Sequence, residues 1–98
     1  MQVKYKNRKL EVICTNAAEA QKKYSEQMAE LIHERIDQLS AFDTVEMLIR
    51  FKIGRCHPLK GQRKEQYAMD LVHPFRLIFE KHGTDIQIAF ILEITDYH

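Results

Sequence analysis

The last three residues of the chain, Asp96, Tyr97 and His98, place a carboxylate, a phenol and an imidazole directly after an apolar run. Upstream, His57 precedes Pro58 in a segment that also carries several lysines and arginines. Histidines and carboxylates can exchange protons near neutral pH, and cations stabilise the negative charge that develops on a phosphoryl group. The combination is suited to acid–base chemistry on a phosphodiester.

Positive charge is concentrated in one segment, although the formal net charge of the whole chain is only +1. Residues 50–64 contain no acid, and their cations are Arg50, Lys52, Arg55, Lys60, Arg63 and Lys64. A solvated loop is the ordinary explanation of such a run. The histidine and the two glycines within it instead favour a localised contact with a polyanion such as RNA.

The 98 residues, 45% of them hydrophobic, indicate one domain (1–98) with a small core. No apolar run approaches the roughly 20 residues that span a bilayer, and residues 1–6 lack the apolar segment of a signal peptide. Cys14 and Cys56 are too few for a secreted disulfide framework. We therefore expect a cytoplasmic protein. The cysteines also lack zinc-site spacing and the carboxylates are not clustered, so we expect no metal and no cofactor.

Helical periodicity dominates the first half of the chain. Residues 16–40 contain neither Gly nor Pro, and Asn16 with Glu19 three positions later is typical of a helix N-terminus. One long amphipathic helix is predicted there, with an apolar face formed by Ala17, Ala20, Tyr24, Met28, Leu31, Ile32, Ile36 and Leu39. Asp43 followed by Glu46 indicates a second, short helix that turns Val45, Leu48 and Ile49 inward.

Strand-like patterns precede and follow these helices. Residues 2–6, 67–72 and 76–81 are predicted strands, with a break at His73-Pro74 and a turn at His82-Gly83. A last strand would carry Ile86, Ile88, Phe90, Leu92 and Ile94 on one face, and Asp96 continues that phase. The order of elements predicts an α+β domain, with one long and one short helix on one face of a small, mostly antiparallel sheet.

Four segments taken in order resemble HigB toxins, also called plasmid maintenance system killer proteins, of the RelE/ParE superfamily of type II toxin–antitoxin systems. They are His57–Gly61 (HPLKG), Arg63-Lys64, Phe75–Phe79 (FRLIF) and Asp96-Tyr97-His98. The resemblance covers residues 55–98 and implies a RelE-like fold. It also implies a cytoplasmic bacterial mRNA endonuclease that works in the ribosomal A site and arrests growth by inhibiting translation. Its expected partners are mRNA, the ribosome and an antitoxin, often with a helix-turn-helix domain, but neither a membrane nor DNA bound by the toxin alone.

The resemblance also implies roles for individual residues. The catalytic set would be His57, Lys60, Arg76, Asp96, Tyr97 and His98. In it the imidazoles and the carboxylate would transfer protons, the phenol would position or stack RNA, and the two cations would face the phosphate. Either histidine could act as the base. The remaining cations of the basic segment would bind RNA: Arg50, Lys52, Arg55, Arg63 and Lys64.

Two positions depart from the HigB pattern. Tyr67 stands where many relatives have Trp, and Glu65 stands where Gly is common, which adds an acid beside the basic segment. Two other classes of protein also remain open. One is a ParE-like toxin that binds gyrase, which needs no acid–base set. The other is a noncatalytic RNA-binding module, which would carry more aromatic side chains among its cations than the single Phe51.

Overall fold

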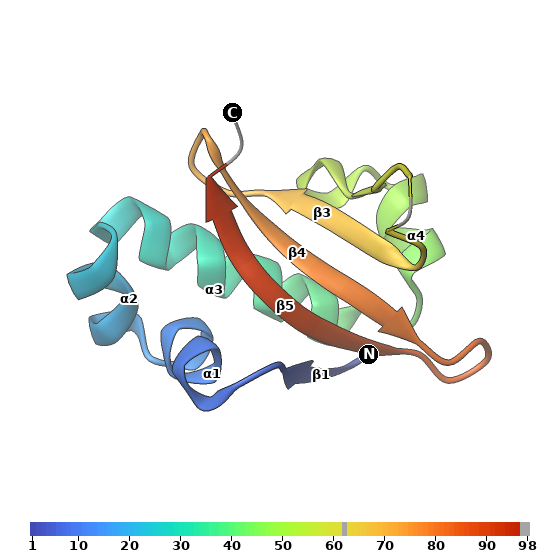
Figure 1. Ribbon diagram of the computed structural model, residues 1–98, viewed down its shortest axis with the longest axis horizontal. Helices are drawn as coiled ribbons and strands as arrows, with labels where there is room; N and C mark the ends of the chain where they lie inside the picture. The colour runs from blue at the N-terminus through green and yellow to red at the C-terminus, as the bar shows by residue number, and fades with distance from the viewer. Residues whose placement is uncertain (62, 97–98) are drawn as a thin grey trace.

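The computed structural model describes residues 1–61 and 63–96, and Figure 1 shows the arrangement of the elements. Four α-helices pack against a five-stranded sheet. In the view of Figure 1, helix α3 (Glu26–Ala41) passes behind strands β4 (Phe75–His82) and β5 (Ile88–Asp96), and α1 (Arg8–Thr15) lies to the lower left of β5. The predicted α+β class, with helices on one face of a mostly antiparallel sheet, is confirmed.

The sheet has the strand order β1-β5-β4-β3-β2. The remaining strands are β1 (Gln2–Tyr5), β2 (His57–Pro58) and β3 (Gln66–Asp70). β1 pairs with β5 in parallel, and all other neighbouring strands are antiparallel. The predicted strands near both ends of the chain and on either side of His73-Pro74 are therefore present. The sequence did not predict β2, which is only two residues long.

Each α-helix begins behind a polar side chain that accepts a hydrogen bond from a backbone N–H group of the first turn. The other helices are α2 (Ala17–Lys23) and α4 (Val45–Arg50), and the short 3-10 helix η1 (Ile53–Arg55) follows. The capping residues of α1 to α4 are Asn7, Asn16, Ser25 and Thr44. The cap predicted at residue 16 is confirmed, whereas the helix behind Asn7 was not predicted.

The single long helix predicted over residues 16–40 is wrong, because the chain breaks at Tyr24 and Ser25. Ser25 has an extended backbone (φ −167°, ψ 167°), and its hydroxyl accepts a hydrogen bond from the N–H of Met28 at 3.0 Å. The ring of Tyr24 packs edge-on against Phe75, with 5.4 Å between the centroids. A new helix therefore starts at this cap, and α2 and α3 run in different directions (Figure 1).

A bulge divides β5 into two halves. In the ladder with β4, Ile78 pairs with Glu93, but the next residue, Phe79, pairs with Ile91. Leu92 is therefore an extra residue on β5, and side chains before and after it alternate in different phase.

This change of phase corrects the predicted core face of the last strand. Before the bulge, Ala89 and Ile91 are fully buried, whereas Ile88 and Phe90 are only partly buried. After the bulge, Ile94 packs against the core as predicted. Ile86, which was predicted to belong to the same face, precedes the strand and is 86% exposed.

The core lies between the helices and the sheet. The predicted short helix is confirmed as α4, which buries Val45 and Leu48 completely. In the sheet, the rings of Tyr67 and Phe79 stack with 5.6 Å between centroids, so the aromatic residue that departs from the HigB pattern is a core residue. Burial of each large apolar side chain contributes roughly 1.5–3 kcal/mol. This packing fixes the sheet on which the candidate site is built.

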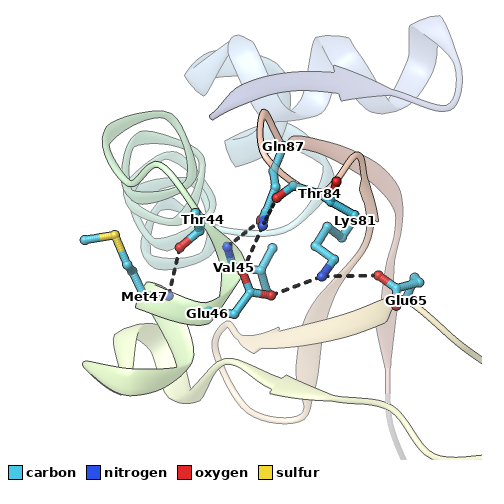
Figure 2. Close-up of polar contacts among 8 residues, drawn as sticks. All are labelled: Thr44, Val45, Glu46, Met47, Glu65, Lys81, Thr84 and Gln87. Atoms are coloured by element: carbon cyan, nitrogen blue, oxygen red, sulfur yellow. Dashed lines mark hydrogen bonds and ion pairs between the residues drawn. The ribbon is translucent and has the colours of Figure 1, made fainter.

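A buried amide connects α4 to the turn between β4 and β5 (Figure 2). The Oε1 of Gln87, a residue only 5% exposed, accepts a hydrogen bond from the N–H of Val45 at 2.8 Å. Its Nε2 donates to Glu46 at 2.8 Å and to the carbonyl of Thr84 at 3.1 Å. Helix α4 is thus fastened to the sheet by a side chain and not by apolar packing alone.

The same network reaches Glu65, the residue directly after the basic segment, through Lys81. The Nζ of Lys81 lies 3.0 Å from Glu46 and 3.4 Å from Glu65 (Figure 2). The hydrogen bond from Gln87 and the ammonium of Lys81 lower the pKa of Glu46. Glu65 has φ 62°, a left-handed conformation that glycine adopts most easily. The acid that departs from the HigB pattern therefore pairs with a lysine in a backbone position suited to glycine.

Candidate active site

Four predicted site residues come together at one pocket of about 240 Å³. β2 supplies His57, β4 supplies Arg76, and the connection between β2 and β3 supplies Lys60 and Arg63. Among residues 1–61 and 63–96, the lining consists of His57, Pro58, Leu59, Lys60, Arg63 and Arg76. One imidazole and three cations therefore surround a space of small-molecule dimensions.

Strand register explains why these side chains share a face. His57 pairs with Ala68, and Arg76 pairs with Asp70. Ala68 and Asp70 are two residues apart in β3 and so project to the same side of the sheet. Met69, between them, is part of the core. His57 and Arg76 consequently lie on the face of the sheet that is turned away from the helices.

A backbone contact orients the imidazole of His57. Its Nδ1 lies 2.8 Å from the carbonyl oxygen of Arg55. Because a carbonyl oxygen only accepts hydrogen bonds, Nδ1 carries the proton of this contact. In the neutral ring, Nε2 then keeps its lone pair, which is the state a general base requires.

A tight turn brings that carbonyl into position. Lys52, Gly54 and Arg55 all have left-handed backbones, with φ of 56°, 55° and 53°. A Cβ atom on Gly54 would lie 2.6 Å from Nε of Arg35, so a side chain there would displace this guanidinium group as well as strain the backbone. Left-handed backbone at a residue other than glycine costs roughly 1–2 kcal/mol. The turn beside the site thus retains backbone strain, as functional sites often do.

Asp70 is the polar centre next to the pocket, and the sequence did not identify it. Its carboxylate accepts two hydrogen bonds from Arg55, Nε to Oδ2 at 2.6 Å and Nη2 to Oδ1 at 3.1 Å. Nε of Arg76 lies 3.8 Å from the same Oδ1. The backbone carbonyl of Asp70 accepts a third hydrogen bond, from Nε of Arg35 at 2.7 Å. One signal was available in the sequence. Asp70 and Arg76 are each three residues from His73, so they would face each other if the two predicted strands paired around this break.

Electrostatics keep Asp70 ionised. Hydrogen bonds from Arg55 lower the pKa of Asp70, and the charges of Arg55, Arg76 and His57 act in the same direction against partial burial. The same pairing raises the pKa of Arg55. A permanent negative charge therefore lies beside the guanidinium groups that border the pocket.

The predicted RNA-binding cations fall into two groups. Arg63 lines the pocket, with Nη2 3.5 Å from Glu93 and Nε donating to Gln66 at 2.9 Å. Arg55 lies beside the pocket and is engaged by Asp70. The other three, Arg50, Lys52 and Lys64, are exposed and do not line it. The basic segment therefore does not form one continuous cluster around the imidazole.

The predicted tail lies mostly beyond the described residues. Asp96 ends β5 opposite Phe75, one register position from the pair of Thr95 with Arg76. Its backbone is thus at the same end of the sheet as the pocket, although Asp96 is not a lining residue. Tyr97 and His98 fall outside residues 1–61 and 63–96, and their predicted roles stay predictions.

The described residues offer neither a cluster of metal ligands nor an ionised thiol near this pocket. Within residues 1–61 and 63–96, no three His, Cys, Asp or Glu side chains are grouped as metal ligands. Cys56 precedes the candidate base, but burial raises the pKa of its thiol to about 12, so it remains protonated. No helix in the described part of the chain has the length and apolar character to cross a membrane.

Comparison with known proteins gives a structural relative. No model of a protein family matches the chain, and no curated protein matches it. Among solved structures, the YoeB/ParE toxin from Agrobacterium tumefaciens is similar, with a TM-score of 0.66 and 15% sequence identity over 100% of both chains. The chain therefore has the fold of this toxin from end to end.

Proposed function

We propose that the chain is a HigB-type toxin of the RelE/ParE superfamily. Its activity would be that of an mRNA endonuclease acting in the ribosomal A site, within a type II toxin–antitoxin system. One observation carries the proposal: the Arg55 carbonyl selects the tautomer of neutral His57 that carries its proton on Nδ1, and this ring belongs to a pocket with three cations. The toxin fold and the ordered HigB-like segments support it.

The proposed reaction uses the 2′-hydroxyl of the substrate as nucleophile. Nε2 of His57 would remove the proton of this hydroxyl, and the resulting oxyanion would attack the adjacent phosphorus. Lys60 and Arg76 would stabilise the charge that accumulates on the phosphorane oxygens. The 5′-oxygen would then leave and take a proton from the C-terminal Asp96 or His98. The products would be a 2′,3′-cyclic phosphate and a 5′-hydroxyl end.

Asp70 would assist in two ways. Its charge favours the imidazolium that forms when His57 accepts a proton, because opposite charges stabilise each other. Its contacts with Arg55 and Arg76 would also hold both guanidinium groups beside the pocket before RNA arrives. Asp70 is therefore proposed as a positioning residue.

Primer extension on mRNA from a translating extract tests the proposal. We expect discrete cuts when the protein is added, and no cut at a site where the ribose is replaced by its 2′-deoxy or 2′-O-methyl form. The ribosomes stay intact in both arms, so their own Mg²⁺ requirement does not affect the comparison. A cut at the 2′-deoxy site, or a 5′-phosphate on the downstream fragment, would show that water attacks instead.

A gyrase assay tests the main alternative. A ParE-like toxin would block supercoiling by purified gyrase and leave the mRNA intact. Such an inhibitor has no use for a base, so His57→Ala should retain gyrase inhibition if this alternative is correct. Loss of mRNA cleavage in His57→Ala, without an effect of either protein on gyrase, is the outcome that we expect.

A further inference from the structure

A long groove follows helix α3 and contains no residue of the His57 pocket. Its volume is about 760 Å³, and it extends from Ala17 and Gln21 of α2 to Phe42 just after α3. Ala29 and Ala41 lie between these ends. Because α3 has 16 residues, the helix that the groove follows is about 24 Å long.

The border of this groove is acidic. Its lining includes Glu26, Glu30, Glu34 and Asp37, and no lysine or arginine of the described ranges. Glu34 contacts Nη1 of Arg35 at 3.1 Å, whereas the other three acids have no ion pair within those ranges. Like charges at i, i+4 spacing destabilise a helix. Cations placed along this border would remove that repulsion.

The surface beyond one end of the groove indicates that it suits a ligand with an apolar side. At the end near Phe42, the ring of Phe51 is 6.3 Å away and 57% exposed. Small side chains and an exposed aromatic ring at one end provide contact area for a ligand. The acids would fix the position of a bound cationic helix along the groove.

We propose that this groove binds one cationic amphipathic helix of a partner protein. The helix would place small or aliphatic side chains over Ala29 and Ala41, and lysines or arginines at i, i+4 spacing opposite Glu26 and Glu30. That the partner is an antitoxin rests on the proposed function, but the chemistry of the groove does not. Since the groove and the His57 pocket share no lining residue, this helix would bind without filling the pocket.

Fluorescence anisotropy with a designed probe tests the proposal. The probe is a fluorescein-labelled 16-residue peptide with alanine and leucine on one helical face and lysines at i, i+4 along its edge. A scrambled peptide of the same composition controls for charge alone. At physiological salt we expect the amphipathic probe to bind the full chain at least about tenfold more tightly than the scrambled one. Equal affinities would overturn the proposal.

Charge-matched variants locate the binding site. Glu26→Lys with Glu30→Lys should weaken binding of the probe at least about tenfold. Glu11→Lys with Asp85→Lys makes the same change in net charge outside the groove, at a half-buried and an exposed position, and should change affinity less than about twofold. Equal losses in both pairs would contradict the assignment, and circular dichroism confirms that each variant is folded. The assay contains no RNA and no ribosome, so failure of the nuclease proposal and failure of this one are separate results.

Discussion

The ring of His57 is hydrogen-bonded to the backbone of Arg55, two residues before it, with 2.8 Å between Nδ1 and the carbonyl oxygen. The tautomer of the candidate base in its neutral form is therefore set by a main-chain group that no side-chain substitution removes directly. The carbonyl is held in turn by the left-handed turn at Lys52, Gly54 and Arg55. The base and the basic segment are thus parts of one local structure.

Replacement of His57 tests its role as base. His57→Ala should slow mRNA cleavage by about 10²- to 10⁴-fold, because a positioned general base typically contributes that much. Single-turnover primer extension measures the rate. His82→Ala, an exposed histidine that does not line the pocket, is the matched control and should cleave at the wild-type rate. A folded His57→Ala protein with unchanged cleavage would contradict the assignment.

Asp70→Asn tests the positioning role. The amide keeps the shape of the carboxyl group but loses the charge that holds Arg55 and Arg76. We expect cleavage to slow by about 10- to 100-fold through misplaced guanidinium groups, with RNA affinity changed far less. Rate constants at saturating and subsaturating protein separate these effects. A loss confined to affinity would indicate that Asp70 acts only through general electrostatics.

Asp70 also predicts how stability depends on pH. Pairing with Arg55 holds the pKa of the folded carboxyl group below its usual value. Its contribution to the free energy of unfolding is therefore present above about pH 4 and is lost as the pH falls through the lowered pKa. Urea unfolding of the wild type and Asp70→Asn should show a constant difference above about pH 5 that shrinks in acid. A difference that grows with acidification would contradict this pairing.

The cations should differ in what they contribute. Lys60→Ala and Arg76→Ala should lower the maximal rate of cleavage, because their charge meets charge that grows in the transition state. Arg50→Ala and Lys52→Ala, outside the pocket, should mainly weaken RNA binding and reduce its dependence on salt. Binding titrations at several salt concentrations, together with single-turnover rates, distinguish the two groups. Equal losses of affinity at all four positions would favour a noncatalytic RNA-binding module.

The buried amide of Gln87 predicts a large loss of stability upon substitution. Gln87→Leu would leave the N–H of Val45 buried without its acceptor, at a cost of about 1–3 kcal/mol in the free energy of unfolding. Urea denaturation measures this loss. Gln27→Leu, at an exposed position of α3, should change stability by less than about 0.5 kcal/mol. Similar values for the two variants would show that the network in Figure 2 is energetically unimportant.

How far the sequence predicts this fold depends on the range of the interactions involved. Caps such as Asn16 are local, and the sequence identified that one correctly. The break before α3 also depends on a local cap, Ser25, but a continuous apolar pattern concealed it. The phase of β5 depends on Leu92, whose extra position is visible only in the pairing with β4.

The candidate site shows the same division. His57, Lys60, Arg63 and Arg76 were predicted, and they meet at one pocket because the segment from His57 to Arg63 lies beside the start of β4. Asp70 was missed, because its importance comes from Arg55 in a turn and Arg76 in a neighbouring strand. A carboxylate in an alternating strand is an ordinary exposed residue until its cross-strand partner is known.

The extra residue in β5 divides this strand into two parts whose side chains are constrained by different neighbours. Residues before Leu92, such as Ala89 and Ile91, must satisfy the packing of the core. Residues after it, from Glu93 to Asp96, border the end of the sheet that carries the pocket. Because the bulge absorbs a change of alternation, an insertion or deletion near Leu92 can be accommodated there without turning Asp96 to the other face. A change of length at this bulge therefore leaves both Ile91 in the core and the strand end at Asp96 in place, while Ile94 between them still packs against the core.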